Sequence, residues 1–198
     1  MGGQNNWKLE SITDRIKWSG CHTRCWIRAD VCRFLCHHLF KVDYATIKIT
    51  ASPLKGFYGT FKDKIIISAN SVHSSPIQIF GTVIDDMRKV STATAPRMKC
   101  SQSYFNLGNI SLKKHIQRKV KVTNEGANPL IIRKIECPEF VSTNIRGEKV
   151  LKQNECLEVL FELNVSSSNH LLDAKVKLIT NDAHQPVHTV IFEGEIGK

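Results

Sequence analysis

The sequence predicts an all-β protein, on the basis of three observations. Short runs of alternating apolar and polar residues recur along most of the chain, as in Leu157–Asn164 (LEVLFELN), and a period of two is typical of a half-buried strand. Turn signals rich in Asn, Gly, Pro and Asp separate these runs. In addition, a strand, turn and strand near residue 70 recur near residue 181, so the chain contains an internal repeat.

The repeat sets the size of the folding unit. Lys64–Asn70 (KIIISAN) aligns without a gap with Lys175–Asn181 (KVKLITN). Gly81 aligns with Gly194 after small changes in the length of the turn. Each copy has a turn that opens with Asn, which predicts a hairpin. A period of roughly 110 residues is typical of one β-sandwich domain and is too long for a solenoid repeat.

The second copy, residues 98–198, contains seven predicted strands and therefore indicates a complete immunoglobulin-like sandwich. The strands are expected at Tyr104–Leu107, Ile116–Thr123, Leu130–Glu136, Phe140–Asn144, Leu157–Asn164, Ala174–Thr180 and Val187–Ile196. Alternation predicts which side chains form the core. They are Val120, Val122, Leu157, Val159, Phe161, Leu163, Val176, Leu178, Val190 and Phe192.

The first copy is expected to be partial. Residues 42–83 match only the trailing strands, and residues 84–97 (IDDMRKVSTATAPR) are predicted to be a linker. Residues 1–41 show no alternating strands but a narrow apolar stripe at helical spacing. The stripe consists of Trp18, Cys21, Cys25, Cys32, Cys36 and Leu39. Either a helix replaces the front of the first sandwich, or, as we favour, the segment is not native coding sequence and the domain is cut through its middle.

A partial domain would expose apolar surface and unpaired strand edges, so we expect the chain to self-associate through residues 42–83.

Two groups of motif residues give the chain a resemblance to a known family. The first is Thr123, Asn124, Gly126, Asn128, Pro129 and Leu130, and the second is Thr180, Asn181, Asp182, Pro186, Gly194 and Ile196. In the pattern that they form, the chain resembles the Hydin-type immunoglobulin-like domains, related in fold to major sperm protein, and most of all their bacterial branch of uncharacterised repeat proteins. The resemblance implies an immunoglobulin-like fold and a place in a bacterial cell envelope. It implies no activity, because the matching residues form turns and core.

Composition and charge exclude some classes of protein. No run approaches the roughly 18 apolar residues of a membrane span, and the N-terminus lacks the residue order of a signal peptide. The net charge is +10, spread as +4 over residues 1–50, +4 over 51–99 and +2 over 100–198. The one basic cluster, Lys113–Lys121 (KKHIQRKVK), alternates with apolar residues like a solvated strand face and lacks interleaved aromatic residues.

The N-terminal segment also holds the candidate metal ligands, which are Cys21, Cys25, Cys32, Cys36, His37 and His38. Thiolates and imidazoles are the ligands that zinc prefers. On a straight helix, however, the first and last of these cysteines would lie about 22 Å apart, too far for one ion. We therefore predict no metal site.

No catalytic motif such as GxSxG, HExxH, GxxxxGK[ST] or GxGxxG is present. We expect His170, His184 and His188 to be solvated in or beside polar turns, and Gly126 to occupy a turn position with positive φ. The sequence thus predicts a protein without catalytic residues or a cofactor.

Two functions remain. The first is a structural or protein-interaction module of tandem immunoglobulin-like sandwiches with an unidentified protein partner. The alternative is a basic nucleic-acid-binding protein, which only the net charge supports.

Overall fold

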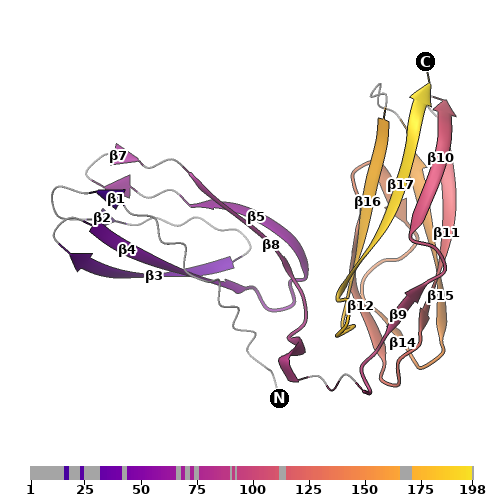
Figure 1. The fold of residues 1–198 in the computed structure, drawn as a ribbon, viewed down its shortest axis with the longest axis horizontal. Helices are drawn as coiled ribbons and strands as arrows, with labels where there is room; N and C mark the ends of the chain where they lie inside the picture. The colour runs from indigo at the N-terminus through magenta and orange to yellow at the C-terminus, as the bar shows by residue number, and fades with distance from the viewer. Residues whose placement is uncertain are drawn as a thin grey trace. The chain divides into compact units, whose positions relative to one another are not determined.

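The computed structural model describes residues 16–17, 23–24, 32–41, 44–65, 68–69, 72–73, 76–89, 91, 93–111, 115–165 and 171–197. The chain divides into two compact units, Met1–Val83 and Ile84–Lys198, and Figure 1 shows the strands of each. Apart from one short 3-10 helix, η1 (Met87–Lys89), every regular element in the described ranges is a strand. The all-β prediction is therefore confirmed.

The first unit contains three small sheets. Their strand orders are β1-β4-β3, β2-β6-β7 and β5-β8. The strands are β1 (Ile16–Lys17), β2 (Thr23–Arg24), β3 (Cys32–Lys41), β4 (Tyr44–Pro53), β5 (Gly59–Ile65), β6 (Ser68–Ala69), β7 (Val72–His73) and β8 (Ile77–Val83).

The N-terminal helix, the less favoured of the two alternatives for residues 1–41, is wrong where the structure describes that segment. Cys32–Lys41 form β3, a ten-residue strand that pairs antiparallel with β4 along its whole length. The sequence CRFLCHHLFK is rich in aromatic and aliphatic residues that fit a strand, and pairing with a neighbouring strand outweighs a weak local helical pattern. The expectation that no strand precedes residue 42 is wrong for the same reason. Self-association through residues 42–83 rested on that expectation and stays a prediction.

The hairpin of β5 and β8 has the pairing register that the internal repeat predicts. In the first unit Gly81 lies opposite Phe61. In the second unit Gly194 lies opposite Leu172. When the gap-free part of the alignment between the two copies is extended towards the N-terminus, Phe61 aligns with Leu172. Gly81 aligns with Gly194. The two hairpins therefore share one pairing register, although their sequences differ.

The second unit is a sandwich of two sheets, with strand orders β10-β17-β16-β12-β14 and β13-β15-β11-β9. Its strands are β9 (Met98–Cys100), β10 (Tyr104–Ser111), β11 (His115–Asn124), β12 (Leu130–Glu136), β13 (Val141–Thr143), β14 (Lys149–Leu151), β15 (Cys156–Asn164), β16 (Leu171–Thr180) and β17 (Val187–Gly197). All seven predicted strands are present. The three-residue strands β9 and β14 were not predicted, because they are too short to show a period.

The core of the second unit confirms the predicted alternation. Nine of the ten predicted core side chains are fully buried, and Leu157 is partly buried against the same cluster. Phe192 lies at its centre, stacked on Phe105 with ring centroids 5.1 Å apart and edge-on to Phe161 at 5.6 Å. Such aromatic pairs add to the free energy that area burial provides.

Residues 84–97, which we call the connector, are bonded to the second unit. The carboxylate of Asp85 pairs with Nε of Arg133 at 2.9 Å, and both side chains are largely buried. Near the end of the connector, the backbone N–H of Asn128 donates to the carbonyl of Thr94, and that of Glu125 donates to the carbonyl of Arg97. The connector is thus fixed to β12 and to the turn after β11.

The turn after β11 corrects one prediction. Gly126 does not have a positive φ. Instead it is buried beneath the connector, where a Cβ atom would collide with the carbonyl oxygen of Ala95 and lie 2.6 Å from Cα of Pro96. Glycine is required because another backbone segment passes directly over it.

Asp182 joins the connector end to the hairpin of β16 and β17. Its buried carboxylate accepts hydrogen bonds from the backbone N–H of Met98 at 2.8 Å and of His184 at 2.9 Å. His188 lies beside it, with Nε2 3.4 Å from Oδ2 of Asp182 and no hydrogen-bond partner for that nitrogen in the described residues. The expectation that His188 is solvated is wrong, because its side chain is only 12% exposed. His184 is exposed as predicted.

Burial lowers the pKa of His188 below its usual value, and the carboxylate of Asp182 opposes this effect only in part. The unfolded chain therefore binds a proton near pH 6.5 that the folded chain takes up only at lower pH. We expect the melting temperature to fall as the pH is lowered from 7.5 through 6.5, and this contribution to level off below the folded pKa. Thermal denaturation at a series of pH values measures it. His188→Gln should flatten the dependence, whereas His184→Gln should leave it unchanged.

Candidate interaction surface

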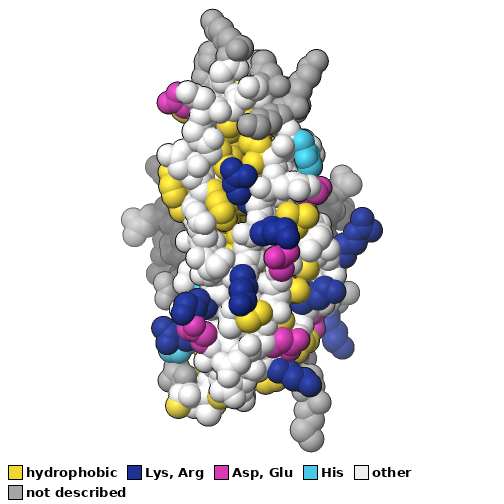
Figure 2. All heavy atoms as spheres, turned by 90° about the vertical axis from the view of Figure 1, so that its right-hand side faces the viewer, with side chains coloured by type: hydrophobic (Ala, Val, Ile, Leu, Met, Phe, Trp, Pro, Cys, Tyr) yellow, Lys and Arg dark blue, Asp and Glu magenta, His cyan; other side chains and the backbone are white. Residues whose placement is uncertain are grey.

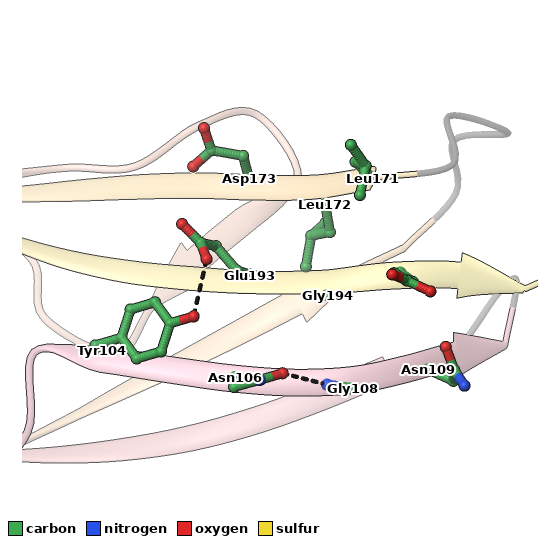
Figure 3. A pocket seen from close by; sticks show the side chains of 10 residues that line it. Tyr104, Asn106, Gly108, Asn109, Leu171, Leu172, Asp173, Glu193 and Gly194 are labelled. Carbon is green, nitrogen blue, oxygen red and sulfur yellow. Dashed lines mark hydrogen bonds between the residues drawn. The ribbon is translucent and has the colours of Figure 1, made fainter.

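The outer face of the five-stranded sheet carries a shallow depression of about 590 Å³ at the side of β10, β17 and β16 (Figure 3). The side chains of these strands alternate between the core and the outer face, so the lining residues come mainly from the outward positions. They are Tyr104, Asn106, Gly108, Asn109, Leu171, Leu172, Asp173, Glu193, Gly194 and Glu195.

Two glycines shape the backbone where β10 meets β17. Gly108 has a φ of +61° within a β-bulge between Asn106 and Asn109, and its N–H donates to the side-chain oxygen of Asn106 at 2.9 Å. Gly194 lies opposite this bulge, where a Cβ atom would lie 2.9 Å from the backbone carbonyl oxygen of Gly108. The missing side chain therefore lets β10 approach β17 closely.

Three carboxylates lie on the outer face of β16 and β17. Asp173 and Glu193 are direct cross-strand partners, and Glu195 follows two residues later. Like charges in directly opposite positions destabilise a strand pair. The repulsion is reduced in part, because Lys175 pairs with Asp173 at 3.0 Å and the hydroxyl of Tyr104 donates to Glu193 at 2.8 Å (Figure 3). That hydrogen bond raises the pKa of Tyr104.

Two apolar side chains lie beside these carboxylates in solvent. Leu171 is 72% exposed and Tyr104 is 47% exposed. An apolar residue at the surface is unremarkable by itself, but here two of them share one hollow with negative charge. The combination suits a ligand that has both an apolar group and a positive charge.

The comparisons with known proteins identify the fold family. The sequence model of the family "HYDIN/CFA65/VesB-like, Ig-like domain" matches residues 96–195, which is 100 of the 198 residues. The protein belongs to this family. The resemblance that the turn motifs suggest is therefore confirmed, and residues 96–195 are called the HYDIN-like domain below.

Solved structures also resemble this chain. A protein of unknown function from Porphyromonas gingivalis W83 matches with a TM-score of 0.57 at 12% identity, over 96% of this chain and 87% of that one. The Vibrio cholerae VesB protease matches with a TM-score of 0.39 at 16% identity, over 51% of this chain and 32% of that one. The first match supports the fold alone. No match was found among curated protein sequences.

The candidate metal ligands lie outside the HYDIN-like domain. Cys32, Cys36, His37 and His38 belong to β3, while Cys21 and Cys25 lie outside the described residues. Along a strand, Cys32 and Cys36 are separated by about 13 Å, at 3.3 Å per residue. In the part of the chain that the structure describes, no three His, Cys, Asp or Glu side chains are placed to hold a metal ion. His170 also lies outside the described residues.

Two thiols of the HYDIN-like domain, those of Cys100 and Cys137, are poor nucleophiles. Cys100, Cys137 and Cys156 are free cysteines. Burial raises the pKa of Cys100 and of Cys137 to about 11, so both are protonated at neutral pH.

Of the helices in the described ranges, none has the length and hydrophobicity that a membrane crossing requires.

The part of the basic cluster that the structure describes, from His115 to Lys121, forms a solvated strand face on β11, as predicted. Val120 and Val122 point into the core, while Lys119 and Lys121 are exposed. Acidic residues of neighbouring elements accompany this face, and Lys119 pairs with Glu158 of β15 at 2.8 Å. Figure 2, which views the HYDIN-like domain from this side, shows Lys and Arg side chains scattered among acidic and apolar ones, without one continuous basic patch.

No pattern that the sequence analysis used indicates the depression. Its residues come from β10, early in the sequence of the HYDIN-like domain, and from β16 and β17, late in that sequence. The parallel pairing of β10 with β17 brings them together. A signal existed in retrospect, because Glu193 and Glu195 flank a glycine at outward positions of a predicted strand.

Proposed function

We propose that the protein is a non-catalytic structural and protein-interaction module, and that the depression on β10, β16 and β17 binds a segment of another protein. The observation that carries this proposal is the combination of exposed Leu171 and Tyr104 with three carboxylates in one hollow. Membership of an immunoglobulin-like family agrees with it, since such folds commonly act through surfaces and strand edges.

The chemistry of the hollow favours a cationic partner. Asp173 and Glu193 face each other across the strands, so a lysine or arginine brought by a partner would relieve their repulsion. The exposed side chain of Leu171 would be covered by an apolar residue of the same segment. The partner is thus a segment that carries Lys or Arg next to Leu or an aromatic residue.

Nucleic acid is the less favoured partner. The depression would repel phosphate, and the basic face of β11 is partly neutralised by ion pairs such as Lys119 with Glu158. Real phosphate contacts make the affinity steeply dependent on salt. A salt titration with random-sequence DNA therefore serves as the competing arm of the test.

The test measures the binding of a fluorescent peptide in which lysine and leucine alternate, by anisotropy at low salt. We expect the double variant Asp173→Asn with Glu193→Gln to weaken binding about tenfold or more, because each carboxylate attracts the same cationic side chain. Leu171→Ser should weaken it about threefold or more through the loss of apolar contact. Both changes are at exposed positions, so the fold should be retained.

The matched control is Glu158→Gln with Glu162→Gln on β15, in the other sheet. It removes two carboxylates as well, and the peptide affinity should stay within about twofold of the wild type. Equal losses from the two double variants would show that binding depends only on overall charge and would contradict the docking site. Tighter, steeply salt-dependent binding of random-sequence DNA would favour the nucleic-acid alternative.

A further inference from the structure

The first long strand of the second unit lies beside its last strand and runs in the same direction. β10 and β17 pair in parallel through six residue pairs, from Tyr104 opposite Ile191 to Ser111 opposite Gly197. The arrowheads of both strands lie at the same end of the sandwich in Figure 1, while the connector joins the unit at the opposite end. The chain therefore reaches β10 at one end of the unit and leaves β17 at the other.

This arrangement determines how the unit responds to tension along the chain. A force that pulls on the start of β10 and on the end of β17 acts along both strands in opposite senses. Within each stretch of a parallel pair the hydrogen bonds are evenly spaced, so the three residue pairs before the bulge and the three after it share such a load. A force applied at the same end of two strands would instead break the bonds one after another.

Side chains hold the two strands together on both faces of the sheet. On the inner face Phe105 is stacked on Phe192 at 5.1 Å with an interplanar angle of 14°. On the outer face the hydroxyl of Tyr104 donates to Glu193 at 2.8 Å. Sliding β10 along β17 would have to separate both contacts at once.

The segment before β10 ties the same end of the chain to the other sheet. β9 pairs with β11, with Met98 opposite Asn124 and Cys100 opposite Val122. In addition, the N–H of Met98 donates to the buried carboxylate of Asp182 at 2.8 Å. Tension on the connector is therefore distributed over both sheets before it can extend β10.

We propose that the second unit is a load-bearing module, in which the parallel pair of β10 and β17 resists tension applied between the two ends of the unit. This role goes beyond the proposed docking function and does not depend on it, since it needs no ligand in the depression.

Single-molecule force spectroscopy on the full chain tests the proposal, with bio-orthogonal handles on unnatural side chains. In the first geometry the handles are at Ser91 and Lys198, so that β10 and β17 are pulled at opposite ends. In the second they are at Ser111 and Lys198, so that the two strands are separated from the same end. At equal loading rate we expect the unfolding force to be about twofold or more higher in the first geometry. Equal forces in the two geometries would overturn the proposal.

A matched pair of variants shows whether the pairing of β10 and β17 carries the load. In Gly194→Ala the new methyl group would lie 2.9 Å from the backbone carbonyl oxygen of Gly108 on β10, and so would push β10 away from β17. In Gly197→Ala the nearest atom is 3.9 Å away. We expect Gly194→Ala to lower the unfolding force in the first geometry and Gly197→Ala to leave it unchanged. An unaltered force in Gly194→Ala, with circular dichroism that shows a folded protein, would contradict the assignment.

Discussion

Replacing Phe192 with alanine is expected to lower the free energy of unfolding of the second unit by about 3–5 kcal/mol. The ring is fully buried and contacts both Phe105 and Phe161, so its removal loses the transfer free energy of the side chain and leaves a cavity between the sheets. A loss of this size is a large share of the roughly 5–15 kcal/mol that is typical of a domain. Hydrogen–deuterium exchange of peptides from β11, β15 and β17 in the full chain measures the effect separately from the first unit.

The control for this prediction is Phe80→Ala. Phe80 lies on β8, the strand of the first hairpin that corresponds to β17, but its side chain is 76% exposed. We expect this substitution to change stability by no more than about 0.5 kcal/mol. Similar losses of protection in β8 for Phe80→Ala and in β17 for Phe192→Ala would mean that the two positions are not distinguished by burial, contrary to the structure.

Replacing Gly126 with valine is expected to destabilise the second unit by about 2–3 kcal/mol. The added side chain would collide with the backbone of Ala95 and Pro96, which cannot move away as a flexible side chain could. The connector should therefore detach, and the amides of residues 94–98 and 124–128 should exchange faster with deuterium.

Ala127→Val is the matched control, because Ala127 is exposed in the same turn. The amide protection of the connector should stay close to that of the wild type in this variant. Detachment of the connector by both substitutions would show that the turn tolerates no bulk at either position, and the explanation from the overlying backbone would be refuted.

The features of the fold that depend on residue period and on turn chemistry could be predicted from the sequence. The core strands of the second unit and their buried residues were predictable because one face of each is buried, which imposes strict alternation. The motif asparagines are also structural. The side chain of Asn181 accepts a hydrogen bond from the N–H of Ile131 at 2.7 Å and donates one to the carbonyl of Pro129 at 3.1 Å. The motif marks this asparagine, but it does not reveal its partners, which lie 50 and 52 residues earlier in the chain.

Other features depend on contacts between distant segments and were missed. The helical pattern around Cys32 was misleading because pairing with β4 decides the conformation of that segment. The need for glycine at position 126 was ascribed to a positive φ. Nothing in the turn itself reveals the actual reason, which is that the connector crosses above this residue. The depression and the burial of His188 likewise follow from packing between elements and not from any local signal.

The position of β17 between two other strands has a consequence for the synthesis of the protein. Among the described strands, β17 is the last of the second unit to emerge from the ribosome, yet it lies between β10 and β16 in the five-stranded sheet. Before β17 has been synthesised, β10 has no partner in its sheet. Glu193, which accepts the hydrogen bond from Tyr104, follows it by 89 residues in the chain. Translation proceeds at about 5–20 residues per second, so the nascent unit exposes an unpaired strand edge for several seconds. During that time it is open to pairing with neighbouring nascent chains or to capture by a chaperone.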